Sequence, residues 1–537
     1  MIRSMEVECI SYRKTGYFSN LINDYLDESE HLRSFYHRFP RIDSFGSQIE
    51  EKKSSYPKQH RLVLHKVLSK QYEGFQVSSS TQEKLKQLKN TTTFTVVTGH
   101  QLNLFTGPLY FLYKIVSTIN LCLELKEGYP EFDFVPVYWM ASEDHDFEEI
   151  NYFNFRGQKL RWNRDSSGAV GRLKNDGLEE VFEAFKGILG NNNRADEILG
   201  KFKRAYLQHK NLADATRHLA NELFGEYGLV IVDGDDAGLK ELLSPYALKD
   251  IIENTGFNAV NATIEEWQNS GDSYHLQVNP REINYFYLKD GLRERIVNTK
   301  EGFGVNNTDI RFSKSEILQE VEQYPERFSP NVISRPLYQE IILPNLCYIG
   351  GGGEIAYWLE LKKSFDDYEV PFPILLLRNS ALMISEKQYG KLQRLDLSLE
   401  NIFLKQSSFI NKKIREISNI NIDFTVQKDH LRKQFEDLYR LAQQTDKSFL
   451  GAVRAQEAKQ TKGLERLEKR LLKAQKRKLK DQVVRMTELQ NELFPNQSLQ
   501  ERTLNFSEVY LEYGSDLIPM LLQALRPLKL EFTVIKV

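Results

Sequence analysis

Three hydrophobic stretches of the sequence each end in residues that could do chemistry. GHQ (99–101) follows FTVV, ASEDHD (141–146) follows FDFVPVYWM, and Asp233 ends GLVIVD. Histidine, carboxylate and amide side chains can transfer protons near neutral pH or orient a substrate amine. The candidate catalytic residues are therefore Asp144, His145, Asp146, His100 and Gln101.

The first of these stretches also has the features of an anion-binding loop. Gly99 permits backbone conformations that other residues resist, and Gly107-Pro108 marks the start of a helix. A helix N-terminus directs unpaired N–H groups and partial positive charge toward the preceding loop. We place Gly99, Asn103 and Gly107 among the candidate substrate- or nucleotide-binding residues. The alternative is that GHQ is only a polar turn before a core helix.

The second stretch is dense in acidic residues, with five Asp or Glu and one His between 143 and 149. Such a density at the end of a buried strand costs repulsion unless a cation, a substrate ammonium or basic side chains offset it. Asp233 is a further candidate for a ribose or an ammonium group. The alternative is a solvated helix N-terminus, where the helix dipole favours acids.

A run of four glycines, Gly350 to Gly353, precedes Glu354 and a predicted helix, EIAYWLELKKSF. Such a run lets backbone N–H groups approach a ligand, as phosphate-binding loops do. Neither a dinucleotide fingerprint nor a P-loop motif is present. Arg335, which we expect in an extended segment before Pro336, is a candidate carboxylate or phosphate clamp, or else a structural ion pair. The remaining candidate binding residues are Gly351, Gly352, Gly353, Glu354 and Tyr357.

The elements that would position these residues alternate between buried strands and helices, which is typical of an α/β fold with a parallel sheet. We expect a helical scaffold over 1–92 and a Rossmann-like core over 93–396. Two insertions interrupt the core, at about 151–225 and 255–330. The second contains a predicted β-hairpin turning at Asp290-Gly291, with Arg281, Arg293 and Arg295 nearby, which could close over a ligand.

Residues 397–493 differ in character, because they contain no proline and show heptad-like apolar spacing. We expect a separate coiled-coil domain of three helices, in which Ser448 to Leu493 forms one long helix with a change of phase after Leu479. Twelve Lys or Arg stand against four Asp or Glu between Gly451 and Arg485. This is a solvated helix face or, alternatively, a polyanion contact. Residues 494–537 return to the core, with EFTVIKV as a final strand.

The composition limits the remaining possibilities. The chain has 537 residues, 41% of them hydrophobic, and a net charge of −2, so nothing favours binding to nucleic acid or to an anionic membrane overall. There is neither a long apolar run nor a signal peptide, and we expect a cytoplasmic protein. Three scattered cysteines, Cys9, Cys122 and Cys347, indicate neither disulfides nor a cysteine zinc site.

Four long stretches resemble the cysteine ligases of bacillithiol biosynthesis, the BshC family, over essentially the whole chain. They are TGHQLNLFTGPLYFLYK, PVYWMASEDHDFEEI, VISRPLYQEIILPNLCYIGGGGEIAYW and LFPNQSLQERTLN. The resemblance implies a Rossmann-like core laid out as in class I aminoacyl-tRNA synthetases and nucleotidyltransferases, connecting insertions, and a dimer-forming coiled coil. Two positions depart from the pattern: many members carry Gln in place of His100, and Gly-Pro-Gly-Glu in place of residues 351–354.

The resemblance also implies a ligase that joins L-cysteine to glucosaminyl-malate through an amide bond, working as a homodimer. Because a free carboxylate has no adequate leaving group, we expect ATP or another nucleotide to activate it. Whether Mg²⁺ accompanies the nucleotide stays open, and no residue is assigned as a metal ligand. Two alternatives remain. One is a metal-dependent hydrolase using Asp144, His145, Asp146 and Asp233. The other is a non-catalytic, nucleotide-binding coiled-coil scaffold.

Overall fold

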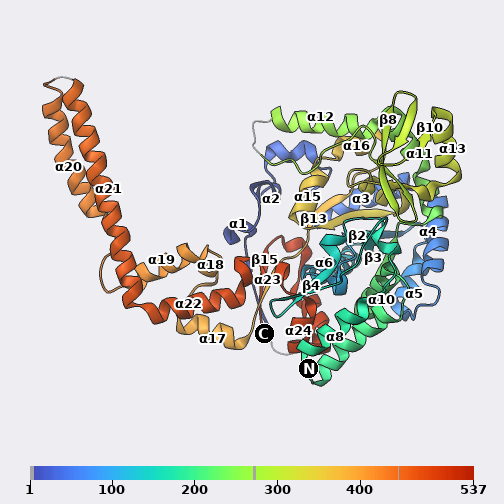
Figure 1. Ribbon diagram of the computed structural model, residues 1–537, viewed down its shortest axis with the longest axis horizontal. Helices are drawn as coiled ribbons and strands as arrows, with labels where there is room; N and C mark the ends of the chain where they lie inside the picture. Colours follow the sequence, from blue (N-terminus) through green and yellow to red (C-terminus); the bar gives the residue numbers. More distant parts are fainter. Residues whose placement is uncertain (1–4, 270–273, 446) are drawn as a thin grey trace. The chain divides into compact units, whose positions relative to one another are not determined.

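The computed structural model describes residues 5–269, 274–445 and 447–537. The chain divides into two compact units, whose elements are drawn in Figure 1. The larger unit contains Tyr17–Leu382 and Gln500–Ile535, with the stretch up to Arg13. The smaller contains Met383–Leu499, with Lys14–Gly16 and the last two residues. No helix of the described residues combines the length and apolar composition needed to cross a membrane.

The larger unit is built on a five-stranded parallel sheet, which confirms the predicted α/β fold. Its strand order is β13-β12-β2-β3-β6. The bounds are β2 (Thr93–His100), β3 (Asp133–Met140), β6 (Val230–Asp233), β12 (Asn345–Gly350) and β13 (Ile374–Leu377). The chain adds β3 and β6 on one side of β2 and then returns to place β12 on the other. This reversal lies between β2 and β12, where open α/β sheets leave a ligand crevice at the carboxyl ends of the strands.

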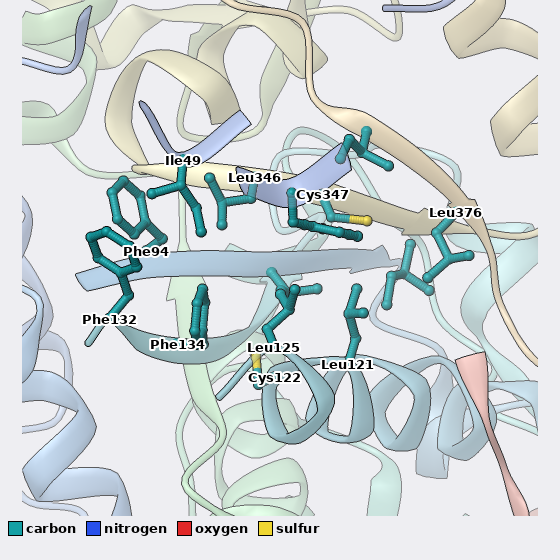
Figure 2. Close-up of a cluster of buried hydrophobic side chains, with 14 residues drawn as sticks. Ile49, Phe94, Leu121, Cys122, Leu125, Phe132, Phe134, Leu346, Cys347 and Leu376 are labelled. Atoms are coloured by element: carbon teal, nitrogen blue, oxygen red, sulfur yellow. The ribbon is translucent and has the colours of Figure 1, made fainter. Parts of the chain in front are cut away.

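Both faces of the sheet are covered by helices. All eight residues of β2 are buried. Leu121 and Leu125 of α6 (Tyr110–Gly128) pack on one side of the strands and Ile49 of α3 (Ile42–Ser55) on the other (Figure 2). Strands enclosed in this way read as continuous apolar runs, which is why the sequence located them.

Helices surround this sheet in the larger unit. Those that precede it are α2 (Asn20–Leu26), α3, α4 (Lys58–Gln71) and α5 (Ser79–Gln87). Those that connect the later strands include α10 (Leu212–Phe224), α11 (Ala237–Glu253), α12 (Thr255–Asn269), α14 (Ser334–Ile342), α15 (Gly352–Leu359) and α16 (Lys362–Asp367).

The second predicted insertion contains an antiparallel sheet of order β10-β9-β8-β7-β11, together with α12 and α13 (Lys314–Gln323). Its strands are β7 (Tyr285–Lys289), β8 (Leu292–Thr299), β9 (Gly302–Val305), β10 (Arg311–Phe312) and β11 (Phe328–Pro330). The predicted hairpin is confirmed, because Lys289 pairs with Leu292 across Asp290 and Gly291. Gly291 has φ 71°, the left-handed conformation that a tight two-residue turn needs. Residues 270–273 of this insertion lie outside the described residues.

Two local predictions in the larger unit were wrong. Arg335 lies in the first turn of α14, not in an extended segment, because a proline is tolerated at the start of a helix. The helix predicted over EIAYWLELKKSF is two helices, α15 and α16, with a break at Glu360-Leu361. The side chain of Glu360 accepts hydrogen bonds from the backbone N–H groups of Gln277 and Val278, which explains why this acid is buried at the break.

The smaller unit is helical. Its longest elements are α19 (Gln406–Ile417), α20 (Thr425–Ala442), α21 (Lys447–Lys478) and α22 (Lys480–Leu493). Phe435 and Ala442 of α20 pack against Val453 of α21, and Figure 1 shows these two helices running side by side. The single helix predicted from Ser448 to Leu493 was wrong, because Leu479 (φ −101°, ψ 30°) separates α21 from α22 at the position where the apolar phase changes.

The predicted final strand is confirmed as β15 (Phe532–Lys536). It does not join the parallel sheet. Instead it lies between β1 (Glu6–Ile10) and β14 (Ala381–Ile384) in a separate three-stranded sheet.

Candidate functional site

A cavity of about 790 Å³ opens at the carboxyl ends of β2, β3 and β12. This is the crevice expected where the strand order reverses. The hairpin β7-β8 supplies its opposite wall. The predicted residues that line it are Gly99, His100, Gln101, Asp144, His145, Arg335, Gly351, Gly352, Gly353, Glu354 and Tyr357.

One side of the cavity is centred on an ion pair between Lys114 and Glu354. The Lys114 Nζ lies 2.5 Å from Glu354 Oε2 and donates a hydrogen bond of 2.7 Å to the carbonyl of Gly99. Glu354 also accepts from the Tyr348 hydroxyl at 2.6 Å and from the Gly351 N–H at 2.8 Å. Burial alone raises the pKa of Glu354, but the Lys114 charge and these hydrogen bonds outweigh it, and the net shift is downward. The carboxylate therefore ties α6 to the glycine loop as an anion.

His100 lies beside this pair at the end of β2. Burial, together with the nearby Lys114 charge, lowers the pKa of His100 to about 3, so the ring is neutral at physiological pH. Its Nε2 atom is buried and has no hydrogen-bond partner in the described residues. Buried polar atoms are normally paired, so this nitrogen is an unsatisfied polar atom of a residue that lines the cavity.

Arg378 follows β13 and completes this side. Its Nη2 donates to Glu501 at 2.7 Å, in an ion pair whose side chains are only 4% and 0% exposed. Its Nε is buried without a hydrogen-bond partner in the described residues, and its guanidinium lies 5.0 Å from the Tyr110 ring centroid. We call His100, Lys114, Glu354 and Arg378 the inner wall. Its charges are neutralised within the protein.

Asp144 stands on the other side of the cavity, after β3. One carboxylate oxygen accepts the His145 N–H at 2.7 Å, and the other accepts the Gln101 amide at 2.9 Å. Gln101 also donates to Glu149 at 2.9 Å. No cation forms a close hydrogen-bonded pair with Asp144 among the described residues, and its side chain is 30% exposed. The carboxylate is held in place and keeps its negative charge available.

His145 is held by the hairpin. Arg293 Nη1 lies 2.6 Å from His145 Nδ1. Because a guanidinium can only donate, Nδ1 must accept, and the ring proton is then on Nε2. Burial and the Arg293 charge both lower the pKa of His145, which favours this neutral form. We call Asp144, His145, Arg281, Arg293 and Arg295 the outer wall.

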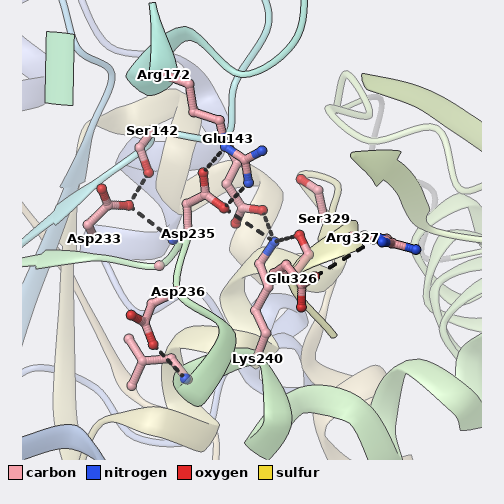
Figure 3. Close-up of polar contacts among 12 residues, drawn as sticks. Ser142, Glu143, Arg172, Asp233, Asp235, Asp236, Lys240, Glu326, Arg327 and Ser329 are labelled. Carbon is pink, nitrogen blue, oxygen red and sulfur yellow. Dashed lines mark hydrogen bonds and ion pairs between the residues drawn. The ribbon is translucent and has the colours of Figure 1, made fainter. Parts of the chain in front are cut away.

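Three acids near the cavity, Glu143, Asp233 and Asp235, do not belong to the outer wall. Each has a partner within the protein, as Figure 3 shows. Glu143 forms a buried ion pair with Lys240, and Arg172 donates two hydrogen bonds of 2.7 Å to Asp235. Asp233 accepts from the Ser142 hydroxyl and from the Asp235 N–H. Burial and the neighbouring Asp235 charge raise the pKa of Asp233. Basic partners from elsewhere in the chain therefore offset the charges of Glu143 and Asp235, while hydroxyl and backbone N–H donors hold Asp233.

Arg335 is the cation between the two walls. Its Nη1 donates to the Gln339 side chain at 3.1 Å and its Nη2 to the Tyr357 hydroxyl at 3.4 Å. Its guanidinium lies 5.9 Å and 5.7 Å from the ring centroids of Trp139 and Tyr348. It forms no ion pair with a carboxylate among the described residues. An oriented guanidinium without a counter-ion suits a substrate carboxylate or phosphate.

Comparison with known proteins identifies this architecture. The family model described as "Bacillithiol biosynthesis BshC, N-terminal Rossmann-like domain" matches residues 5–379. The model described as "Bacillithiol biosynthesis BshC, C-terminal coiled-coil domain" matches residues 381–537. The chain belongs to the BshC family. The resemblance drawn from its sequence motifs is thereby confirmed, as is the combination of a Rossmann-like domain with a coiled coil.

Relatives of this BshC-family chain match it along almost its whole length. A protein of Flavobacterium johnsoniae is 57% identical over 99% of this chain and 100% of its own. One of Christiangramia forsetii is 55% identical over 99% of both chains, and one of Cytophaga hutchinsonii is 38% identical over 98% of both. Each bears the name "Putative cysteine ligase BshC".

Four predicted residues of the BshC-family chain are described by the structure but lie outside the cavity lining: Asn103, Gly107, Asp146 and Asp233. Asn103 donates to the Glu149 carbonyl at 3.2 Å. Gly107 has φ 61°, and a Cβ there would lie 2.6 Å from that of Asn103. Gly107 therefore serves the turn itself. Asp233 ends β6, the edge strand two positions from the reversal point, which explains its distance from the crevice.

Several lining residues were not predicted as site residues, notably Lys114, Tyr348 and Arg378. Two of them carried a signal. Lys114 is a lysine inside the otherwise apolar helix YFLYKIV, and a lysine is rarely buried without a partner. Arg378 directly follows the apolar strand ILLL, as the other strand-end candidates do.

The structure also bears on the hydrolase alternative. In residues 5–269, 274–445 and 447–537, no three His, Cys, Asp or Glu side chains come together as a set that could hold a metal ion. Asp233 is engaged with Ser142, while Asp144 faces Gln101. The ligand cluster that this alternative required does not form among these residues.

Proposed function

We propose that this chain joins L-cysteine to glucosaminyl-malate, forming the amide bond of bacillithiol. The observation that carries the proposal is the single cavity in which the TGHQ, ASEDH and GGGE segments meet, in a chain of the BshC family. The names of the relatives describe a cysteine ligase, and the cavity is lined by the cationic and acidic side chains that such a reaction needs. Arg335, which has the charge and geometry to hold a carboxylate or phosphate, and Asp144, which suits an amine, both line it.

The reaction requires an activated carboxylate. A carboxylate oxygen of cysteine attacks a phosphorus atom of a nucleoside triphosphate and displaces pyrophosphate or a nucleoside diphosphate. The substrate amine then attacks the acyl carbon, the phosphate-containing group leaves with that oxygen, and the amine loses a proton. A bound nucleotide supplies that leaving group. The inner wall suits its phosphates, because the glycines at the start of α15 line the cavity and a Cβ at Gly353 would meet no atom within 4 Å. The open backbone at this glycine allows close approach by a phosphate.

The remaining roles follow from the polarity of each group. Arg335 would hold the cysteine carboxylate, since it has no carboxylate partner in the described residues. Asp144 would orient the substrate amine and accept its proton, and the Nε2–H of His145 would donate a hydrogen bond to the developing oxyanion. A Mg²⁺ ion accompanying the nucleotide would be held mainly by phosphate oxygens and water, as is usual for this ion.

Incubation of the full chain with cysteine, glucosaminyl-malate and ATP tests the proposal. Mass spectrometry should show the thiol product, and omission of any one of the three should abolish it. Cleavage of the amide in the reverse direction without nucleotide, or hydrolysis of an unrelated ester without ligation, would contradict it. Phosphorus NMR of the same mixture separates release of AMP from release of inorganic phosphate, which distinguishes an adenylate from an acyl phosphate.

We also propose that the smaller unit forms a homodimer. Its long helices leave several large apolar side chains exposed, including Leu441 at 52% and Leu467 at 52%. Pairing with a second copy would bury them. Sedimentation velocity should show a dimer that Leu441→Glu or Leu467→Glu weakens. Leu123→Glu, at a residue 57% exposed in the larger unit, is the matched control and should leave the dimer intact. Equal weakening by all three would place the interface elsewhere.

A further inference from the structure

The hairpin side of the cavity contains three arginines. Arg281, Arg293 and Arg295 all line the cavity. None forms an ion pair with a carboxylate among the described residues. By contrast, Arg327 pairs with Glu320 and Arg172 with Asp235, so carboxylates do neutralise other arginines of this region. Several guanidinium groups on one side of a cavity favour the binding of an anion there.

The local fold directs these side chains to one surface. Arg293 and Arg295 alternate with Glu294 along β8, so they project on the same face of the hairpin while Glu294 projects on the other. Their guanidinium groups lie 4.0 Å and 6.0 Å from the ring centroid of Phe286, which pairs with Arg295 across β7 and β8. Phe286 thus provides an apolar base beneath the arginines.

The three arginines differ in how freely they can bind a ligand. Arg293 is anchored, because it donates to His145, to the Ser329 hydroxyl at 3.2 Å and to the Pro330 carbonyl at 3.4 Å. Among the described residues, the guanidinium groups of Arg281 and Arg295 make no hydrogen bond and no ion pair. Arg293 is therefore held in one position, while all the guanidinium N–H groups of Arg281 and Arg295 can donate to a ligand.

We infer that Arg281 and Arg295, with Arg293 beside them, bind the dicarboxylate end of the acceptor substrate. This inference rests on the proposed function. The acceptor, glucosaminyl-malate, carries two carboxylates and an amine on one small molecule. Arg293 directly contacts His145, whose backbone N–H donates to Asp144, so the anion site adjoins the residue assigned to the amine. Planar guanidinium forks match carboxylates in a bidentate manner.

The triphosphate is the other anion in the reaction, and the geometry favours the inner wall for it. Phosphate-binding loops present backbone N–H groups at a helix N-terminus, as the glycines before α15 do. The hairpin offers side chains alone. The two anions would then enter from opposite sides, with the reacting carboxylate and amine between them.

Isothermal titration calorimetry on the full-length protein tests the inference without relying on catalysis. Glucosaminyl-malate should bind the wild-type protein, and Arg295→Gln and Arg281→Gln should each weaken it by about tenfold or more. Affinity for ATP, and for glucosamine without the malyl group, should not change. Arg311→Gln is the matched control, because this arginine of the same sheet lies outside the cavity lining and bonds the carbonyls of Thr308 and Ile310.

Each other outcome overturns the inference in a recognisable way. Loss of ATP affinity in Arg295→Gln would assign the arginines to the triphosphate, and unchanged affinity for glucosaminyl-malate would show that they bind neither. Weakening of every ligand, or equal weakening by Arg311→Gln, would show a structural role. If the variants weaken binding as expected but the protein forms no amide, the dicarboxylate site would stand and the proposed ligase activity would be wrong.

Discussion

The two walls of the cavity carry charge in opposite ways. On the inner wall, Lys114 pairs with Glu354 and Arg378 pairs with Glu501, so each charge has its counter-ion inside the protein. On the outer wall, Asp144 and the hairpin arginines have no such close partners among the described residues, and the Asp144 side chain is 30% exposed. The first arrangement stabilises the fold around the strand reversal. The second leaves charge available for a substrate.

This difference separates stability from activity. Breaking a buried pair leaves an uncompensated charge in a low-dielectric interior, which destabilises the folded state. Removing a solvated, unpaired charge costs the fold little, but it removes an interaction that a substrate would use. Substitutions that break an ion pair of the inner wall should therefore act most strongly on the free energy of unfolding, and those on the outer wall mainly on the rate or on substrate affinity.

The largest effect on stability is expected for Glu501→Gln. It keeps the shape of the side chain but leaves the buried guanidinium of Arg378 without its counter-ion, and we expect a loss of about 3 kcal/mol in the free energy of unfolding. Urea denaturation measures this. Arg295→Gln on the outer wall is the comparison and should change stability by less than about 0.5 kcal/mol. Similar losses in both variants would remove the distinction between the walls.

Asp144→Asn should have the largest effect on activity. The amide keeps one acceptor for the His145 N–H but loses the negative charge and the ability to take a proton, so we expect kcat/KM for amide formation to fall on the order of a hundredfold or more. Stability should change by less than about 1 kcal/mol. Steady-state rates beside thermal melts check both points, and a near-normal rate would assign the proton chemistry to another residue.

His100 should make stability depend on pH. Its pKa is 6.5 in an unfolded chain and about 3 in the folded one. Between these pH values only the unfolded chain binds the proton, so the free energy of unfolding falls as the pH is lowered. From pH ~7.5 to pH ~5.0 the loss is about 2 kcal/mol. The His100→Gln variant should lack this pH-dependent loss. The difference in the free energy of unfolding between the wild-type protein and the variant, measured by urea denaturation, should therefore shrink or reverse at the lower pH. A constant difference at both pH values would mean that His100 becomes protonated in the folded state.

The smallest effect on activity is expected for the same variant at neutral pH. Glutamine retains a hydrogen-bonding group at the position of His100, and the neutral ring is not poised to take a proton, so the rate should fall by roughly tenfold or less. Parallel assays of His100→Gln and Asp144→Asn compare directly the loss of rate caused by a substitution on each wall. A severe loss in His100→Gln beside a mild one in Asp144→Asn would reverse the roles assigned to the two walls.

Much of the architecture was predictable from local sequence. The strands around Val96, Val137 and Ile231 were found because strands buried on both faces are continuously apolar. The hairpin turn at Asp290-Gly291 was found because few dipeptides adopt its backbone conformation. Long motifs also identified the BshC family. The helix break at Leu479 was visible only as a change of phase, which does not say whether a helix bends, supercoils or stops.

The sequence by itself determined which strand ends carry polar residues, since that depends on neighbouring positions along the chain. Only the tertiary structure decided which of those ends meet. His100 and Asp233 each end a strand that the sequence predicted equally clearly. The order of the sheet nevertheless places β2 at the reversal and β6 at an edge. Tertiary structure also chose the partners of charged residues 100 or more positions apart, such as Glu354 for Lys114 and Glu501 for Arg378. An ion pair depends on distance in space, and spacing along the sequence does not encode that distance.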